Sequence, residues 1–297
     1  MRGRIALVVL AGGLLAGLVP VAAGAATLPR RFEIRLDVSR LEPLSGAFFE
    51  VWAVHGERKI SAGGFNVDED GNLVDGFGHE AVFTSPRDPA RADAIVVTIE
   101  PLPDPDPGPS GIVVLEGAPD GDRARLRFPV RLGRIAGTFI LATPTDASTT
   151  NESAGVWFLD PAAGPGPSLT LPALPDGWVW EGWGVTQGVP LSTGRFTSAS
   201  GADDAAPFSG PLAGPPFPGE DFLANLPTSI SPPVDLADGS SVIVLTIEPD
   251  LDGVDPTGDA PFSIKPLIGA VPAGAAAHTS LPLDPDLSTR PRGTASL

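Results

Sequence analysis

The chain has 297 residues, of which 36 are glycine and 35 are proline. Because both residues interrupt regular backbone, this composition excludes a protein built on long helices. Hydrophobic residues still make up 42% of the chain, which is enough to bury a core and argues against disorder. The formal net charge of −17 argues against a nucleic-acid partner. We therefore expect an all-β fold of short strands and many turns.

Residues 1–25 have the composition of a secretory signal peptide. Arg2 and Arg4 precede an uncharged apolar run over residues 5–21, and small residues follow it. We expect cleavage after Ala25, a secreted or periplasmic protein, and no stable membrane span after cleavage. The alternative is a membrane anchor, since the run approaches the ~20 apolar residues that cross a bilayer. The absence of cysteine excludes disulfides and thiolate metal sites.

Residues 26–122 are expected to form a first β-module. Alternating large side chains predict a strand over residues 48–54, followed by a glycine-containing turn and a returning strand that ends at Phe65. Residues 94–100 are rich in Val and Ile and predict another strand. Pro101 ends that strand, because proline has no N–H to donate to a neighbouring strand.

Residues 123–283 are expected to form a second β-module with extra strands at its start, at 125–132, 137–143 and 155–159. A later Val- and Ile-rich run over residues 241–248 predicts a strand that Pro249 ends.

A long loop is expected over residues 198–234, because it contains eight prolines. One short helix is predicted inside it, at 220–225. A loop of this length either binds something or is a surface excursion fixed by its buried aromatic residues, here Phe208, Phe217 and Phe222. Residues 284–297 are polar and are expected to form a flexible tail.

An internal repeat links the two modules. The pattern Glu-x-Trp-x-Val at 50–54, followed by Ser-x-Gly-x-Phe at 61–65, recurs 131 positions later at 181–185 and 192–196. The segment Val-Thr-Ile-Glu-Pro at 97–101 recurs as Leu-Thr-Ile-Glu-Pro at 245–249, and an acidic loop follows each copy. Ordered matches separated by loops of variable length indicate a duplicated module.

Each copy carries one glutamate on an otherwise apolar strand face. Glu50 shares its face with Trp52, and Glu181 shares its face with Trp183. We expect this face to point into the core, where each carboxylate would latch onto backbone N–H groups or an arginine. Trp178 and Trp180 would then point outward. A pair of catalytic carboxylates is the alternative interpretation.

Candidate catalytic groups do not form a pattern in this sequence. It has no cysteine and no Gly-x-Ser-x-Gly motif, and His55, His79 and His278 have no spacing that indicates a shared site. The loops 250–255 and 68–72 resemble parts of a calcium loop, although ordinary turns use the same residues. We assign no catalytic, cofactor-binding or metal-binding residue and expect no cofactor.

The tryptophans are a second candidate site. Trp157, Trp178, Trp180 and Trp183 are close in sequence and are of the type that stacks on sugar rings. Packing in the core is the commoner use of such residues.

The two ordered motifs, with the acidic loop over residues 104–111 that follows the first, resemble the extracytoplasmic C-terminal domain of anti-sigma-K-type anti-sigma factors. The resemblance covers about residues 32–118 and 168–268. It implies two compact all-β modules of a sensory or regulatory kind. It supplies no catalytic residues. The helical domain that binds the sigma factor and the membrane helix of that family have no counterpart in this sequence.

Together these features predict two tandem β-sandwich-like modules in an exported, non-enzymatic bacterial protein that serves as a sensing, binding or envelope-associated module. Its partner would be an extracytoplasmic protein or polymer. A carbohydrate or surface-polymer binding protein that uses exposed Trp residues is the main alternative. A hydrolase with an acidic site is the third.

Overall fold

A computed structural model describes residues 30–162, 164–251, 255–258 and 260–297. The expected signal peptide at 1–25 lies outside them. The described residues form strands, turns and four single-turn 3-10 helices, so the expected all-β fold is confirmed. The helices are η1 (Pro89–Arg91), η2 (Glu152–Ala154), η3 (Leu236–Asp238) and η4 (Leu287–Thr289). No helix within these ranges is long and apolar enough to cross a membrane.

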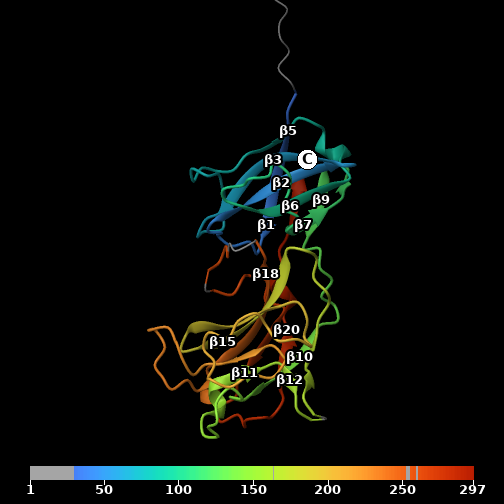
Figure 1. The fold of residues 1–297 in the computed structure, drawn as a ribbon. Helices are drawn as coiled ribbons and strands as arrows, with labels where there is room; N and C mark the ends of the chain where they lie inside the picture. The colour runs from blue at the N-terminus through green and yellow to red at the C-terminus, as the bar shows by residue number, and fades with distance from the viewer. Residues whose placement is uncertain (1–29, 163, 252–254, 259) are drawn as a thin grey trace, which may run out of the picture. The chain divides into compact units, whose positions relative to one another are not determined.

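The first antiparallel sheet has the strand order β4-β3-β2-β6-β7-β9-β21-β1-β5, and β8 pairs with β9 (Figure 1). Its strands are β1 (Phe32–Ser39), β2 (Ala47–His55), β3 (Arg58–Val67), β4 (Leu73–Val74), β5 (Phe83–Ser85), β6 (Ala94–Pro101), β7 (Val113–Gly117), β8 (Pro119–Asp120), β9 (Arg123–Arg127) and β21 (Arg292–Ser296).

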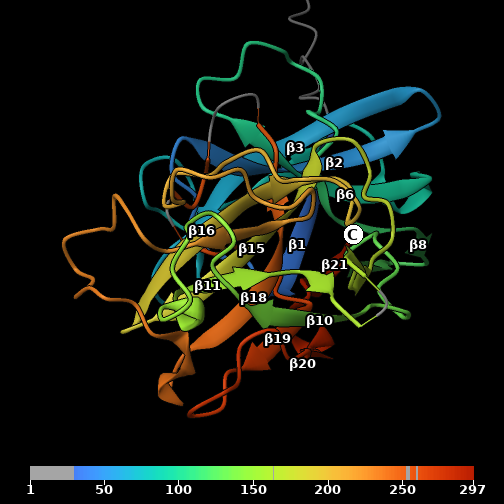
Figure 2. The ribbon, with the colours of Figure 1, turned by 60° about the horizontal axis from the view of Figure 1, so that its bottom comes forward.

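The second antiparallel sheet has the order β16-β15-β18-β19-β20-β10-β11-β17, and β14 pairs with β10. Figure 2 shows β15, β18 and β19 as neighbours in this sheet. Its strands are β10 (Ala136–Leu141), β11 (Gly155–Trp157), β14 (Leu169–Thr170), β15 (Trp178–Thr186), β16 (Val189–Phe196), β17 (Gly219–Asp221), β18 (Val242–Pro249), β19 (Leu267–Ala270) and β20 (Leu281–Pro285). The short strands β12 (Leu159–Asp160) and β13 (Gly166–Pro167) pair with each other.

The duplication extends beyond the sequence motifs. From β3 to β5 the first sheet has the same order of eight strands as the second sheet has from β16 to β17. In each sheet the last strand of that order, β5 or β17, comes from the connection between the returning strand and the Val- and Ile-rich strand. The two repeats therefore form separate sheets, and the prediction of two sandwich-like modules is confirmed.

The C-terminal residues differ from the expected flexible tail. Residues 292–296 form β21, which lies between β1 and β9 in the first sheet, at the place that β10 has in the second (Figure 1). Ala295 is fully buried and lies opposite Ala124 of β9. A strand of this length has a weak local signal, because its stability comes from partners far away in the sequence. Since β9 also belongs to the first sheet, the sheet boundary lies after the expected division at residue 122.

Two further predictions in the second module need correction. The expected strand 125–132 ends at Arg127 within β9. The short helix expected at 220–225 is absent from these described residues, because Glu220 and Asp221 belong to β17 and pair with β11. Phe217 and Phe222 are buried, which supports the interpretation of 198–234 as a packed surface excursion.

The core lies on the strand face opposite to the expected one. Phe49, Val51 and Ala53 of β2 are fully buried in the main hydrophobic cluster, so Glu50 is on the outer face. In β15, Trp178 and Trp180 belong to the same hydrophobic cluster. Trp178 packs edge-on against Phe128, with ring centroids 5.4 Å apart. The prediction that Trp178 and Trp180 point outward is therefore wrong, because alternation alone does not say which face is covered.

Candidate functional site

Each copy of the repeat builds the same chain of hydrogen bonds on the outer face of its sheet. In the first module Trp52 Nε1 donates to Thr98 Oγ1 at 2.9 Å, and the Thr98 hydroxyl donates to Glu100. In the second module Trp183 Nε1 donates to Thr246 Oγ1 at 2.9 Å, and Thr246 donates to Glu248. The repeated tryptophan, threonine and glutamate therefore form one structural unit. The motif Val-Thr-Ile-Glu-Pro contained this signal, because a period of two puts its Thr and Glu on one face.

The repeated serine completes the unit through a β-bulge. The hydroxyl of Ser61 donates to Glu50, and that of Ser192 donates to Glu181. The register shifts at the same place in both copies, and the glycine of Ser-x-Gly has a positive φ, 138° at Gly63 and 104° at Gly194. The bulge explains the spacing of the motif, since the extra residue turns the serine toward the glutamate. A serine hydroxyl makes the latch in both copies, and in the second copy Glu181 also pairs with an arginine, Arg195, as expected.

The two copies differ at the residue after this glycine. In the first module it is Gly64, and a Cβ atom there would lie 2.9 Å from the ring of Phe48. In the second module it is Arg195, whose Nε lies 3.2 Å from Glu181 Oε2 and whose guanidinium also pairs with Asp255 Oδ2 at 3.0 Å. An aromatic ring therefore covers the first copy at this point, whereas a network of charged side chains covers the second.

Burial sets the protonation of the second network. Glu248 is buried, and this desolvation, with the charges of Glu181 and Asp255, raises its pKa to about 8. Desolvation also raises the pKa of Glu181, while the hydrogen bond from Ser192 and the charge of Arg195 offset part of that rise. Glu248 is thus mostly protonated at neutral pH, and Glu181 and Asp255 share the arginine.

A cleft of about 700 Å³ opens over this network in the second module. Glu181, Trp183, Arg195 and Asp255 line it. The long loop also shapes the cleft, which is lined by its residues Asp204, Ala205, Pro207, Phe208, Pro227 and Ser229. The cleft is in the size range of small-ligand sites and combines apolar walls with a few charged groups. Glu181, Asp204 and Asp255 outnumber the single arginine, which favours a cationic group.

A second group of carboxylates fixes the long loop. Asp221 accepts hydrogen bonds from Thr145 N at 2.7 Å and from Trp157 Nε1 at 2.7 Å. Glu220 accepts from the Ser209 hydroxyl, and Asp203 accepts from Gly219 N at 2.8 Å. Desolvation raises the pKa values of Asp203 and Glu220 to about 7. Because their oxygens bind this protein's own donors, we interpret these carboxylates as structural.

The calcium interpretation finds no support in the described residues. None of them form a group of three or more His, Asp or Glu side chains suited to a metal ion. Asp68 instead accepts hydrogen bonds from Asp70 N and from the backbone and side chain of Asn72, as in an ordinary turn. Of the other loop, residues 252–254 lie outside the described residues.

The histidines lie on three different elements. His55 is in β2, His79 is in the connection between β4 and β5, where it lies 3.6 Å from Asp75, and His278 is in the connection between β19 and β20, 3.4 Å from Glu152. Among the described residues they form no common cluster.

The tryptophans do not form an exposed platform. All five, including Trp157 and Trp183, are at most 4% exposed. The carbohydrate-binding alternative therefore lacks the exposed rings on which it depended.

Comparison with known proteins gives no relatives: no protein-family model, no curated protein and no solved structure matches this chain.

Proposed function

We propose that this chain is an exported, non-enzymatic binding or sensing module with two anti-sigma-factor-like extracytoplasmic domains, and that the cleft of the second domain is its ligand site. The observation that carries the proposal is the difference between two copies of one framework. Both copies keep the Trp-Thr-Glu and Ser-Glu hydrogen bonds, but the second adds Arg195, Asp255 and a wall from the long loop.

The cleft suits a cationic group attached to an apolar body. Asp255 is partly exposed and Asp204 lies on the loop wall, so both carboxylates are accessible to a ligand. The Arg195 guanidinium is already engaged by Glu181 and Asp255 and offers little to an anion. Pro190, Pro207 and Phe208 provide the apolar contact surface. An extracytoplasmic protein or polymer that presents lysine-like groups would satisfy both features.

Three peptides of similar shape test this proposal: acetyl-Leu-Lys-amide, acetyl-Leu-Gln-amide and acetyl-Leu-Glu-amide. NMR would follow the indole N–H signals of Trp183 and of its counterpart Trp52. The lysine peptide should shift the Trp183 signal saturably, with an affinity at least about tenfold above that of the glutamine peptide, because a charge-assisted contact adds about 1.5–3 kcal/mol. The glutamate peptide should leave it unchanged.

A matched pair of variants separates the two modules. Asp255→Asn should weaken binding of the lysine peptide about tenfold. Asp104→Asn removes a carboxylate from the corresponding acidic loop of the first module, where the charge of Asp104 raises the pKa of Glu50. This variant should leave binding of the lysine peptide unchanged. Equal affinity for the lysine and glutamine peptides, or equal shifts of the Trp52 and Trp183 signals, would contradict the proposed site.

A further inference from the structure

The first sheet is open along part of one strand edge. β5 pairs with β1 only at Phe32, Glu33 and Ile34, and the chain before β5 turns away to pair with β4. On its other edge β1 pairs with β21 from Arg35 to Ser39. In the part of the chain that the structure describes, nothing pairs with residues 35–39 on the β5 side. Backbone groups on such an edge are ready to bond another strand.

The second sheet shows what covers the same edge. β11 corresponds to β1 and β17 corresponds to β5 in the strand order. All three residues of β11 pair with β17, and the next residue, Phe158, donates its N–H to Pro218 O at 2.9 Å. An extended, apolar stretch of the long loop thus follows this edge in the second module. The first module has no such stretch in its described residues.

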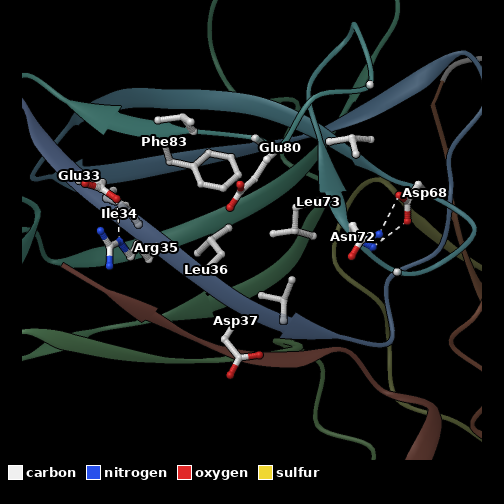
Figure 3. A pocket seen from close by; sticks show the side chains of 16 residues that line it. Glu33, Ile34, Arg35, Leu36, Asp37, Asp68, Asn72, Leu73, Glu80 and Phe83 are labelled. Atoms are coloured by element: carbon white, nitrogen blue, oxygen red, sulfur yellow. Dashed lines mark hydrogen bonds and ion pairs between the residues drawn. The ribbon is translucent and has the colours of Figure 1, made fainter.

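A groove of about 840 Å³ lies along the open edge of β1 (Figure 3). Leu36, Leu73 and Phe83 point into it from β1, β4 and β5. Val82 at the rim is 71% exposed, and Phe77 in the neighbouring turn is 88% exposed. Large apolar side chains that are exposed beside a groove with both apolar and charged lining residues are typical of an interaction site.

The charges around the groove favour a basic partner. Glu33, Asp37 and Glu80 line it together with one arginine, Arg35, which is bonded to Glu33 at 2.7 Å. A second copy of this chain would bring a formal charge of −17 to an acidic rim, which disfavours self-association.

We propose that this groove binds an extended segment of a partner protein, which adds to β1 as an antiparallel strand beyond β5. Its apolar side chains would alternate with lysine or arginine. The apolar side chains would contact Leu36, Leu73 and Phe83, and the basic ones would face Glu80 and Asp37 at the rim. Main-chain hydrogen bonds to β1 would supply affinity, and the alternation would supply selectivity.

A labelled octapeptide of alternating valine and lysine tests this site by fluorescence anisotropy with the full chain. The alternating peptide should bind saturably below 1 mM. A block peptide of the same composition and a version with two central prolines should bind at least tenfold more weakly, because the first loses the alternation and the second loses N–H donors. Absence of binding by the alternating peptide at 1 mM, or equal binding of all three, would overturn the proposal.

Two variants of equal charge change locate the peptide. Val82→Lys places a cation on the rim and should weaken binding at least tenfold, whereas Leu102→Lys, at another exposed apolar residue, should have no effect. Both sites are exposed, so both variants should fold. Equal effects of the two variants would overturn the proposed location.

Analytical ultracentrifugation tests whether the partner is instead a second copy of this chain. A dimer that only Val82→Lys abolishes would assign the groove to self-association and overturn the proposal of a different partner protein. The cleft peptides of the other module test a separate site, so the two proposals fail independently.

Discussion

The two modules use one framework and complete it with different segments. The second module takes all its strands from residues 136–285, whereas the first needs β21 from the end of the chain at the place that β10 has in the second. The second also covers the β11 edge and builds a cleft with its long loop, while the first leaves the β1 edge open. We therefore interpret the hydrogen bonds common to both copies as structural, and we propose that binding occurs at the segments that differ.

The largest expected effect tests the completion of the first sheet. Ala295→Glu puts a carboxylate at a fully buried position of β21 and should destabilise the protein by about 3–5 kcal/mol. Ser296→Glu changes an exposed residue of the same strand and should change stability by less than about 0.5 kcal/mol. Thermal unfolding followed by circular dichroism measures both. Equal melting temperatures for the two variants would show that β21 does not form.

The next prediction concerns the buried glutamates at equivalent places. The pKa of Glu248 rises from 4.5 to about 8 on folding, so its ionisation does not oppose folding well below pH 4.5 but costs a few kcal/mol of stability once the pH exceeds 8. Unfolding free energy should therefore fall as pH rises through this range. Glu248→Gln keeps the acceptor for Thr246 and should flatten the curve, making the variant more stable than the wild type at pH 8.

The counterpart Glu100→Gln is the control for this experiment. Desolvation also raises the pKa of Glu100, but both of its oxygens accept hydrogen bonds from Ser110 N. We expect a smaller gain at pH 8 than for Glu248→Gln. A steeper pH dependence in Glu248→Gln than in the wild type would contradict the account.

A smaller effect concerns two positions at which the copies differ. Phe48 and Gly64 of the first module correspond to Val179 and Arg195 of the second. Gly64→Ala places a Cβ against the Phe48 ring and should cost about 1–2 kcal/mol. In a Phe48→Val background the same change should cost less than about 0.5 kcal/mol, because the ring is gone. Urea unfolding of the four proteins of this double-mutant cycle measures the coupling. Additive effects would show that the two positions are independent.

The smallest expected effect concerns an exposed ion pair. Arg35→Ala removes the partner of Glu33 at the surface of β1 and should change stability by less than about 0.5 kcal/mol. A loss above 1 kcal/mol in urea unfolding would show that the open edge of β1 depends on this arginine.

The sequence predicted the features that depend on local patterns. Composition indicated an all-β chain, and the repeat located β2, β3, β6 and their counterparts, because alternation and proline punctuation act within a strand. The pairing of distant strands and the choice of the buried sheet face were not predictable in the same way. Nothing near Ala295 says that it pairs with Ala124, and nothing near Trp180 says that its face is the buried one. The position of Ala295 depends on a partner strand more than a hundred residues away in the sequence. The burial of Trp180 depends on which segments pack against its face of the sheet.

The candidate cleft was predictable only in part. The repeat identified Glu181, Trp183 and Ser192, and the long loop was a candidate binding segment. The roles of Arg195 and Asp255 were missed, although Arg195 is a visible departure from Gly64 in the aligned motifs. A charged residue in one copy where the other has glycine was the available signal. The long loop over residues 198–234 also lines the cleft, but it has no counterpart in the repeat from which its position could be predicted.

Amide hydrogen exchange of the full chain, followed residue by residue with NMR, tests most directly the claim that one framework is completed in two ways. We predict that amides in β21 exchange as slowly as those of β9, and that β1 beyond Ile34 contains fast-exchanging amides while all of β11 is protected. Fast exchange throughout Arg292–Ser296, or equal protection along both edges, would contradict it.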